Sequence, residues 1–175
     1  MQKPLKILVV RFSSIGDIVL TTPVVRVLKK ELNAEVHFIT KDIFKSVVSH
    51  NPYIDKIHTI KSSVKEIIEE IKEEKFDWII DLHNNLRSAQ LKSIMVKSKS
   101  YNKLNFRKFL LTNFGINILP KSHTVDRYLD TISHLEAKND GLGLDYFLSK
   151  EDEIEVPHSE KSFITFAIGG THFTK

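Results

Sequence analysis

The chain has 175 residues, of which 41% are hydrophobic and 27% are charged, and its formal net charge is +4. These proportions are typical of a globular protein and exclude both an intrinsically disordered chain and a collagen-like repeat. The absence of cysteine excludes disulfides, thiolate metal sites and a thiol nucleophile. The basic excess is too small to indicate nucleic-acid binding, and no apolar run reaches the ~20 residues that a membrane span needs.

Apolar periodicity along the chain predicts strands that alternate with helices. A proline at position 23 either begins a helix after Thr22 or kinks one that began earlier. The alternation predicts an α/β fold with a Rossmann-like parallel sheet, in which ligands bind at the carboxyl ends of the strands. The predicted strands are 6–11, 35–40, 56–60 and 76–82, and the predicted helices are 16–32, 42–49, 64–75, one from about 86, and 122–135 with Ser122 as its N-cap.

The pattern changes near residue 150, which predicts a domain boundary there. Residues 1–150 are expected to form one Rossmann-like domain, and the polar segment after residue 150 is typical of a linker. The following SFITFAIGG segment is typical of a buried strand that begins another βα unit. We therefore expect residues 151–175 to be a linker and the first strand of a second domain, at which the chain is truncated.

The first candidate site is the turn after the first predicted strand, where Ser13, Ser14, Gly16 and Asp17 lie together. No GxGxxG or P-loop motif is present there. Asp17 falls in the first turn of the next helix, whose positive dipole end favours an ionised carboxylate. Such a carboxylate at the ligand edge of a sheet can act as a general base, and the alternative is an ordinary acidic residue at a helix start.

The second candidate site is the polar loop after the fourth predicted strand. It holds Asp81, His83, Asn84, Asn85 and Arg87, whose side chains can bind hydroxyls or anions, and His83 is expected to titrate near neutral pH. The alternative is that Asn84 and Asn85 only form a turn and cap the next helix.

Residues 86–108 hold basic side chains, including Lys103 and Arg107, and no acidic one. Phenylalanine and leucine residues interleave with or follow them. This pattern suits an anionic ligand or a lipid headgroup surface, or else a solvated lysine-rich face. The histidines show neither an HExxH motif nor a tight cluster with acidic residues, so no protein-bound metal is predicted. Neither GxSxG nor a glycosidase-type carboxylate pair is visible.

Four segments in order resemble the ADP-heptose:lipopolysaccharide heptosyltransferases, glycosyltransferase family 9. They are KILVVRFSSIGDIVLTTPVVRVLKKEL, FDWIIDLHNNLRSA, HTVDRYL and FAIGGTHFTK. The resemblance covers essentially the whole chain. It implies the N-terminal, acceptor-binding domain of a GT-B fold, in which two Rossmann-like domains face each other across a cleft.

The resemblance also implies a reaction. Asp17 would take the proton from an acceptor hydroxyl, heptose would move from an ADP-sugar to the lipopolysaccharide inner core with inversion, and no metal or other cofactor would be needed. The partners would be the ADP-sugar, a lipid-anchored glycan acceptor and the inner face of the inner membrane, in a cytoplasmic protein that does not bind nucleic acid. This chain alone is expected to be inactive. The implied substrate-binding residues are Ser13, Ser14, Gly16, His83, Asn84, Arg87, Lys103 and Arg107, and Lys175 with Thr174 would hold the donor phosphates.

Two other functions stay open at this point. One is a different GT-B sugar-nucleotide enzyme of the epimerase kind, which would need no acceptor. The other is a glycan- or lipid-binding module without catalysis, and the apolar final strand argues against it because an unpaired apolar edge invites aggregation.

Overall fold

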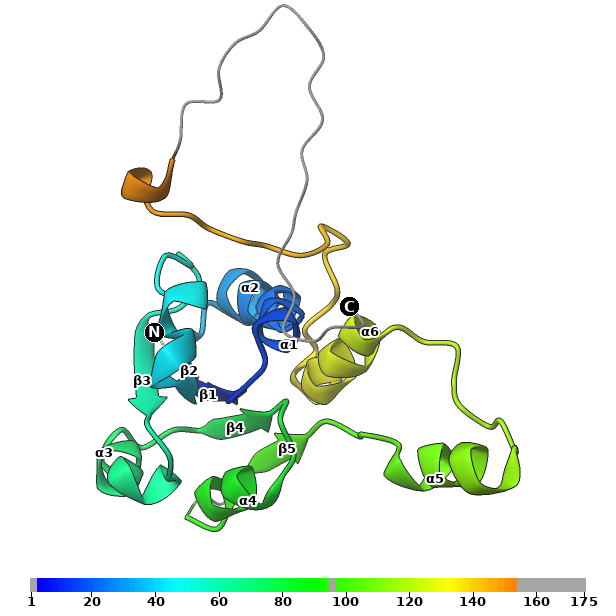
Figure 1. The fold of residues 1–175 in the computed structure, drawn as a ribbon. Coiled ribbons are helices and arrows are strands. Elements are labelled where there is room, and N and C mark those ends of the chain that lie inside the picture. The colour runs from blue at the N-terminus through cyan, green and yellow to red at the C-terminus, as the bar shows by residue number, and fades with distance from the viewer. Residues whose placement is uncertain (1–2, 95–96, 154–175) are drawn as a thin grey trace, which may run out of the picture.

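The computed structural model describes residues 3–94 and 97–153. Its centre is a five-stranded sheet with the strand order β3-β2-β1-β4-β5, in which all neighbouring strands are parallel (Figure 1). Parallel neighbours need a crossover connection, which explains why helical segments separate the strands. The strands are β1 (Lys6–Val10), β2 (Glu35–Lys41), β3 (Lys56–Ile60), β4 (Trp78–Asp81) and β5 (Ser98–Ser100).

Helical segments cover both faces of the sheet (Figure 1). The α-helices are α1 (Ile15–Val19), α2 (Thr22–Leu32), α3 (Ile68–Glu73), α4 (Leu86–Lys92), α5 (Asn105–Phe114) and α6 (Thr124–Leu129). The 3-10 helices within residues 3–94 and 97–153 are η1 (Asp42–Val47), η2 (Val64–Glu66), η3 (Asp130–Leu135) and η4 (Lys150–Asp152). In Figure 1, α5 projects away from the sheet.

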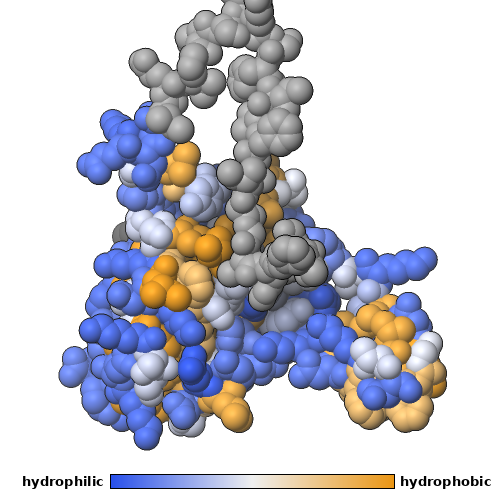
Figure 2. All heavy atoms as spheres, viewed as in Figure 1, coloured by the Kyte–Doolittle hydropathy of each residue, from blue (hydrophilic) through white to orange (hydrophobic). Residues whose placement is uncertain are grey.

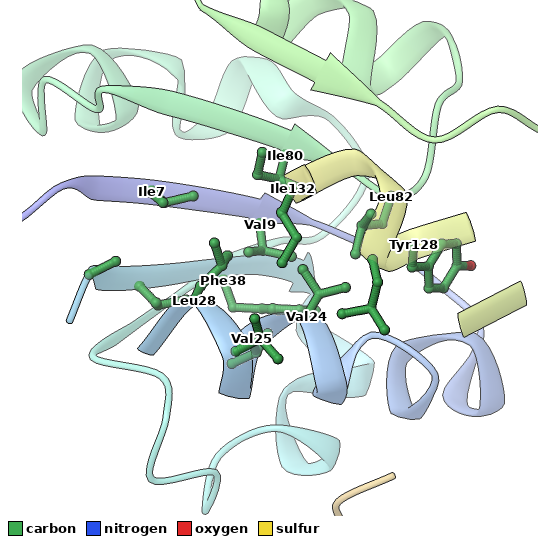
Figure 3. Close-up of a cluster of buried hydrophobic side chains, with 14 of the residues drawn as sticks. Ile7, Val9, Val24, Val25, Leu28, Phe38, Ile80, Leu82, Tyr128 and Ile132 are labelled. Carbon is green, nitrogen blue, oxygen red and sulfur yellow. The ribbon is translucent and has the colours of Figure 1, made fainter. Parts of the chain in front are cut away.

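Alternate side chains of β1 enter two different apolar clusters, as the two-residue period of a strand requires. Ile7 and Val9 pack with α2, α6 and η3 on one face, as Figure 3 shows. Leu8 and Val10 pack with residues of η2, α3 and α4 on the other face. Because both faces are covered, β1 reads as a continuous apolar run in the sequence.

The structure confirms the parallel α/β fold and the four predicted strands, whose ends differ by at most two residues from the prediction. The predicted helix 16–32 is instead two helices, since α1 ends at Val19 and α2 begins at Thr22 with Pro23 in its first turn. The predicted helix 64–75 is divided into η2 and α3.

Smaller differences concern other parts of the described chain. The predicted helix 42–49 is the 3-10 helix η1, and the region 122–135 is α6 followed by η3. The N-cap of α6 is His123, which accepts from the Val125 N–H, and not Ser122. The strand β5 and the helix α5 were not predicted.

A buried arginine fixes the segment after η3 to the body of the domain. Arg26 of α2 has only 1% of its surface exposed. Its guanidinium forms a two-bond contact with Asp140 (Nε–Oδ2 2.6 Å, Nη2–Oδ1 2.8 Å) and also pairs with Asp145. Nη2 donates to the Gly143 carbonyl at 2.9 Å. The carboxylates raise the pKa of Arg26 further above its ordinary value, so its charge is permanent.

Two sequence predictions lie outside the described residues: the strand in SFITFAIGG, and the donor-phosphate residues Thr174 and Lys175. The predicted domain boundary near residue 150 stays a prediction. Within the described part of the chain, no helix combines the length and the apolar character that crossing a membrane requires.

Candidate active site at the carboxyl ends of β1 and β4

The order of the sheet determines where a ligand site is expected. The chain passes from β1 to β2 and β3 on one side, and then returns to place β4 on the other side of β1. In open α/β sheets, ligands bind outside the carboxyl ends of the strands at this change of direction. Here the loops that begin at Arg11 and at Leu82 meet at that point, because the Leu82 N–H donates to the Val10 carbonyl at 3.1 Å.

Arg11 connects the two loops to helices α1 and α6. Its guanidinium is buried and donates to the carbonyls of Ser13 (2.6 Å) and Leu82 (2.7 Å) and to the Tyr128 hydroxyl (2.9 Å). Its remaining nitrogen, Nη2, lies 2.6 Å from Oδ2 of Asp17. Arg11 therefore fixes the position of Asp17 relative to the sheet.

Asp17 lies in the first turn of α1 and presents part of its carboxylate to solvent. Oδ2 accepts from the Ser14 hydroxyl at 3.1 Å and the Ser14 N–H at 3.4 Å, in addition to Arg11. Among the described residues, Oδ1 has no hydrogen-bond partner, and 41% of the side chain is exposed. The arrangement therefore holds one oxygen in place and leaves the other available to a ligand.

The loop after β4 is organised by the carboxylate of Asp81, which is completely buried. Its Oδ1 accepts from the N–H groups of His83 (3.0 Å) and Asn84 (2.7 Å), and its Oδ2 lies 3.0 Å from the Lys92 ammonium. Asn84 adopts a left-handed conformation and donates to the Tyr101 carbonyl at 2.8 Å. Asn85 caps α4. The structure thus supports the alternative interpretation, a turn and a helix cap, for these two asparagines.

His83 stays a candidate ligand-binding residue, but its expected titration near neutral pH is wrong. Burial, and the positive charges of Arg11 and Lys103, lower its pKa to about 4. Its ring packs edge-on against Phe12 at 5.3 Å. Nδ1 is buried and has no hydrogen-bond partner among the described residues. At neutral pH the ring is therefore a neutral hydrogen-bonding group.

The remaining predicted residues lie in different places. Ser13, Ser14 and Gly16 are in the Asp17 loop, and a Cβ built at Gly16 meets no atom within 4 Å, so packing does not require glycine there. Burial lowers the pKa of Lys103, and the positive charge of the nearby Arg11 lowers that pKa further. Lys103 therefore lies close to the Asp17 loop. Arg87 is exposed near the start of α4. Arg107 lies on α5, where its guanidinium donates to the Ile118 carbonyl at 3.3 Å.

A hollow of about 350 Å³ lies between the end of β5 and helix α6. The Arg127 guanidinium is at its wall, 5.2 Å from the Tyr101 ring centre. Nε and Nη1 of Arg127 are buried and have no partner among residues 3–94 and 97–153. The hollow is lined by Lys99, Ser100, Asn102, Leu104, Pro120, Ser122, Arg127, Asp130 and Thr131.

Sequence analysis missed two residues of the site as such, Arg11 and Tyr128. Both belong to segments that it had singled out, SSIGD with its preceding arginine and HTVDRYL. They are 117 positions apart and meet only because α6 packs against the carboxyl end of β1. The available signal was an arginine directly after an apolar strand that is predicted to be buried, because a buried charge needs several hydrogen-bond partners.

No protein-family model matches the chain. In sequence, the chain is 25% identical to lipopolysaccharide heptosyltransferase 1 of Campylobacter coli, over 75% of this chain and 42% of that protein. The chain resembles the heptosyltransferases of glycosyltransferase family 9. Because the match covers 42% of that protein, the chain spans less than half the length of the curated heptosyltransferase.

Solved structures show the same likeness in the fold. A glycosyl transferase of family 9 from Veillonella parvula superimposes with a TM-score of 0.63 at 22% identity, over 86% of this chain and 47% of that one. The E. coli heptosyltransferase WaaC with ADP gives a TM-score of 0.62 at 18% identity, over 81% of this chain and 50% of that one. The E. coli ADP-heptose lps heptosyltransferase II gives a TM-score of 0.57 at 19% identity, over 73% of this chain and 40% of that one. The resemblance predicted from the sequence is thereby confirmed.

Proposed function

We propose that this chain is the acceptor-side domain of an inverting glycosyltransferase that moves heptose from an ADP-sugar to the lipopolysaccharide inner core. The observation that carries the proposal is Asp17, which Arg11 and Ser14 hold through one oxygen at the switch point of the sheet. Its support from outside the chain is the similarity to a heptosyltransferase in sequence and to three family structures in fold.

In the proposed reaction, Oδ1 of Asp17 takes the proton from the acceptor hydroxyl as that oxygen attacks the anomeric carbon. The new carbon–oxygen bond forms on the face opposite ADP, the bond to the diphosphate breaks, and ADP leaves with the electron pair. The configuration at the anomeric carbon therefore inverts. A positioned general base contributes about 10²–10⁴-fold to such a step. The transfer step as proposed uses no metal, and Lys175 with Thr174 would offset the charge that develops on the diphosphate.

The acceptor would lie over the loops that surround Asp17. The open space at Gly16 allows a sugar to approach the backbone closely. His83, Lys103 and Arg127, whose Nε and Nη1 have no hydrogen-bond partner among the described residues, supply donors for hydroxyls and for anionic groups of the acceptor. Asn84, whose amide is already bound to Tyr101, is the weaker candidate.

The proposal is tested by a transfer assay on the protein as its source expresses it, with ADP-heptose and the lipid acceptor. A native mass near twice 20.2 kDa and an acceptor-dependent release of ADP are expected. Release of a free or epimerised sugar without acceptor would favour the epimerase-like alternative. Acceptor binding without any ADP release would favour the non-catalytic module.

We also propose that α5 contacts the inner face of the inner membrane, where a lipid-anchored acceptor lies. Phe106, Phe109 and Phe114 are 70%, 52% and 64% exposed, and Figure 2 shows apolar residues on the projecting helix. Lys103, Arg107 and Lys108 adjoin them, and residues 86–108 contain no acidic side chain. Apolar side chains next to cations are the pattern of a helix that lies on an anionic bilayer.

Replacing Phe106 and Phe109 together with serine is expected to weaken binding to anionic vesicles at least tenfold. Each phenylalanine that enters the bilayer contributes about 1.5–3 kcal/mol, and 1.4 kcal/mol corresponds to a factor of ten. Sedimentation with phosphatidylglycerol-containing vesicles measures the effect. The control is Ile43→Ser, which removes an even more exposed (76%) apolar side chain from η1. Equal binding by the double variant and the wild type would contradict membrane contact through α5.

A further inference from the structure

Two buried histidines and one glutamate form a cluster on the face of the sheet that α3 covers. His37 of β2 and His58 of β3 are each 2% exposed. Glu74 directly follows α3 and joins them, so that one potential ligand atom from each of the three lies within 4.8 Å of the others. The prediction that no histidine forms a tight cluster with acidic residues is therefore wrong for this pair.

Each of the two imidazoles is oriented by a carboxylate at its far nitrogen. Nε2 of His37 lies 3.0 Å from Glu35, and Nδ1 of His58 lies 2.9 Å from Glu70. The other two ring nitrogens, His37 Nδ1 and His58 Nε2, face each other at 2.9 Å. A histidine that binds a metal almost always donates its other N–H to a carboxylate or carbonyl in this way.

The number of hydrogens in this chain of contacts points to a cation between the rings. A carboxylate can only accept, so a neutral ring that donates to its carboxylate carries its hydrogen on the far nitrogen. In that tautomer both facing nitrogens, His37 Nδ1 and His58 Nε2, present lone pairs that a metal cation can accept.

We propose that His37 Nδ1, His58 Nε2 and a Glu74 carboxylate oxygen bind one divalent transition-metal ion of the zinc class. Imidazole ligands favour zinc and its neighbours over magnesium or calcium. Zn–N distances of about 2.0–2.1 Å in a tetrahedron place two ligand nitrogens roughly 3.4 Å apart, so the rings separate by about half an ångström. A water molecule takes the fourth position.

The charges around the cluster are compatible with a cation. Glu35, Glu70 and Glu74 face the two ammonium groups of Lys6 and Lys56, which leaves an excess of one negative charge. Lys56 competes for the proposed ligand, because its Nζ lies 2.6 Å from Glu74. Since 46% of the Lys56 side chain is exposed, it can turn into solvent when the ion enters. Removing Lys56 should therefore strengthen binding of the ion.

The place of the cluster indicates a structural role for the ion. β3 is the edge strand of the sheet, and its register pairs Ile39 with His58 and His37 with Lys56. An ion held by His37, His58 and Glu74 would join β2, the edge strand β3 and the end of α3. It is no part of the proposed transfer reaction, whose site follows the carboxyl ends of β1 and β4.

The test uses the 175-residue chain, stripped with a chelator and titrated with Zn²⁺ alone. Calorimetry is expected to give one ion per chain. At a free Zn²⁺ concentration of 100 times Kd, the melting temperature should rise by about 5–10 °C. His58→Gln should lose both effects, whereas His134→Gln, which changes an exposed imidazole, should keep them. Absence of a Zn²⁺-dependent shift in the wild type, or an equal shift in His58→Gln, would overturn the proposal.

Two further variants keep the test decisive if His58→Gln fails to fold. Glu74→Gln should weaken Zn²⁺ binding at least tenfold, and Lys56→Gln should strengthen it several-fold. Both variants break the Lys56–Glu74 ion pair, and Glu74→Gln also removes the partner of Lys6. A merely structural role of these pairs therefore predicts a change in the same direction in both variants. Co²⁺ bound to the wild type should give the visible absorption of a tetrahedral site, and changes in the same direction in both variants would contradict metal binding.

Discussion

Replacing Asp17 with asparagine in the protein that carries the donor domain is expected to lower kcat for heptose transfer by about 10²–10⁴-fold. Asparagine keeps the size of the side chain and an oxygen that can accept from Ser14 and Arg11. It cannot take a proton from the acceptor hydroxyl. The loss should therefore appear in the chemical step, with KM for the ADP-sugar changed little. Single-turnover and steady-state transfer assays measure the two quantities.

The matched control is Asp42→Asn. Asp42 is also an acidic residue in the first turn of a short helix that follows a strand, and it is exposed. Its replacement should leave transfer unchanged. The melting temperature of Asp42→Asn should stay at that of the wild type, because Asp42 is exposed. Asp17→Asn removes the charged partner of the buried Arg11 but leaves its hydrogen bonds to Ser13, Leu82 and Tyr128, so that variant should stay folded with a lowered melting temperature. Turnover of the Asp17 variant within tenfold of the wild type would remove Asp17 from the role of general base.

Replacing Arg26 with alanine is expected to destabilise the domain by about 3 kcal/mol, the lower end of the range for breaking a buried ion pair. The guanidinium is 1% exposed, and its loss leaves the carboxylates of Asp140 and Asp145 without the cation that neutralises them. Both carboxylates are 16–19% exposed and regain some hydration, which keeps the cost near the lower limit. For a chain of this size the melting temperature should fall by roughly 6–12 °C.

Lys29→Ala on the same helix is the control for this prediction. Lys29 also pairs with an aspartate, Asp55 at 2.6 Å, but both side chains are about one-third exposed. Removing such a surface pair costs about 0–1 kcal/mol. Urea unfolding of the three proteins measures the difference. If Arg26→Ala and Lys29→Ala lost the same small amount of stability, burial of the Arg26 network would not be a major source of stability.

The predicted strands that the structure confirms are those whose own residues form a strong local pattern. The runs ILVV of β1 and WII of β4 are apolar without interruption because both strands are covered on both faces of the sheet. β5 was missed because its sequence, Ser-Lys-Ser, has no apolar residue. It is a strand only because β4 offers backbone partners along its free edge. α5 was missed because its apolar residues do not face the core and follow no clear period.

By itself, the sequence determined the α/β class, the alternation of strands and helices, and the position of Asp17 in the first turn of a helix after β1. Those features depend on residue types that are close together in the chain. Only the tertiary structure decided which side chains meet. The Arg11–Tyr128 contact spans 117 positions, the Arg26–Asp140 pair spans 114, and His37 and His58 meet across 21. Such contacts depend on strand order, parallel register and helix packing, which local periodicity does not specify.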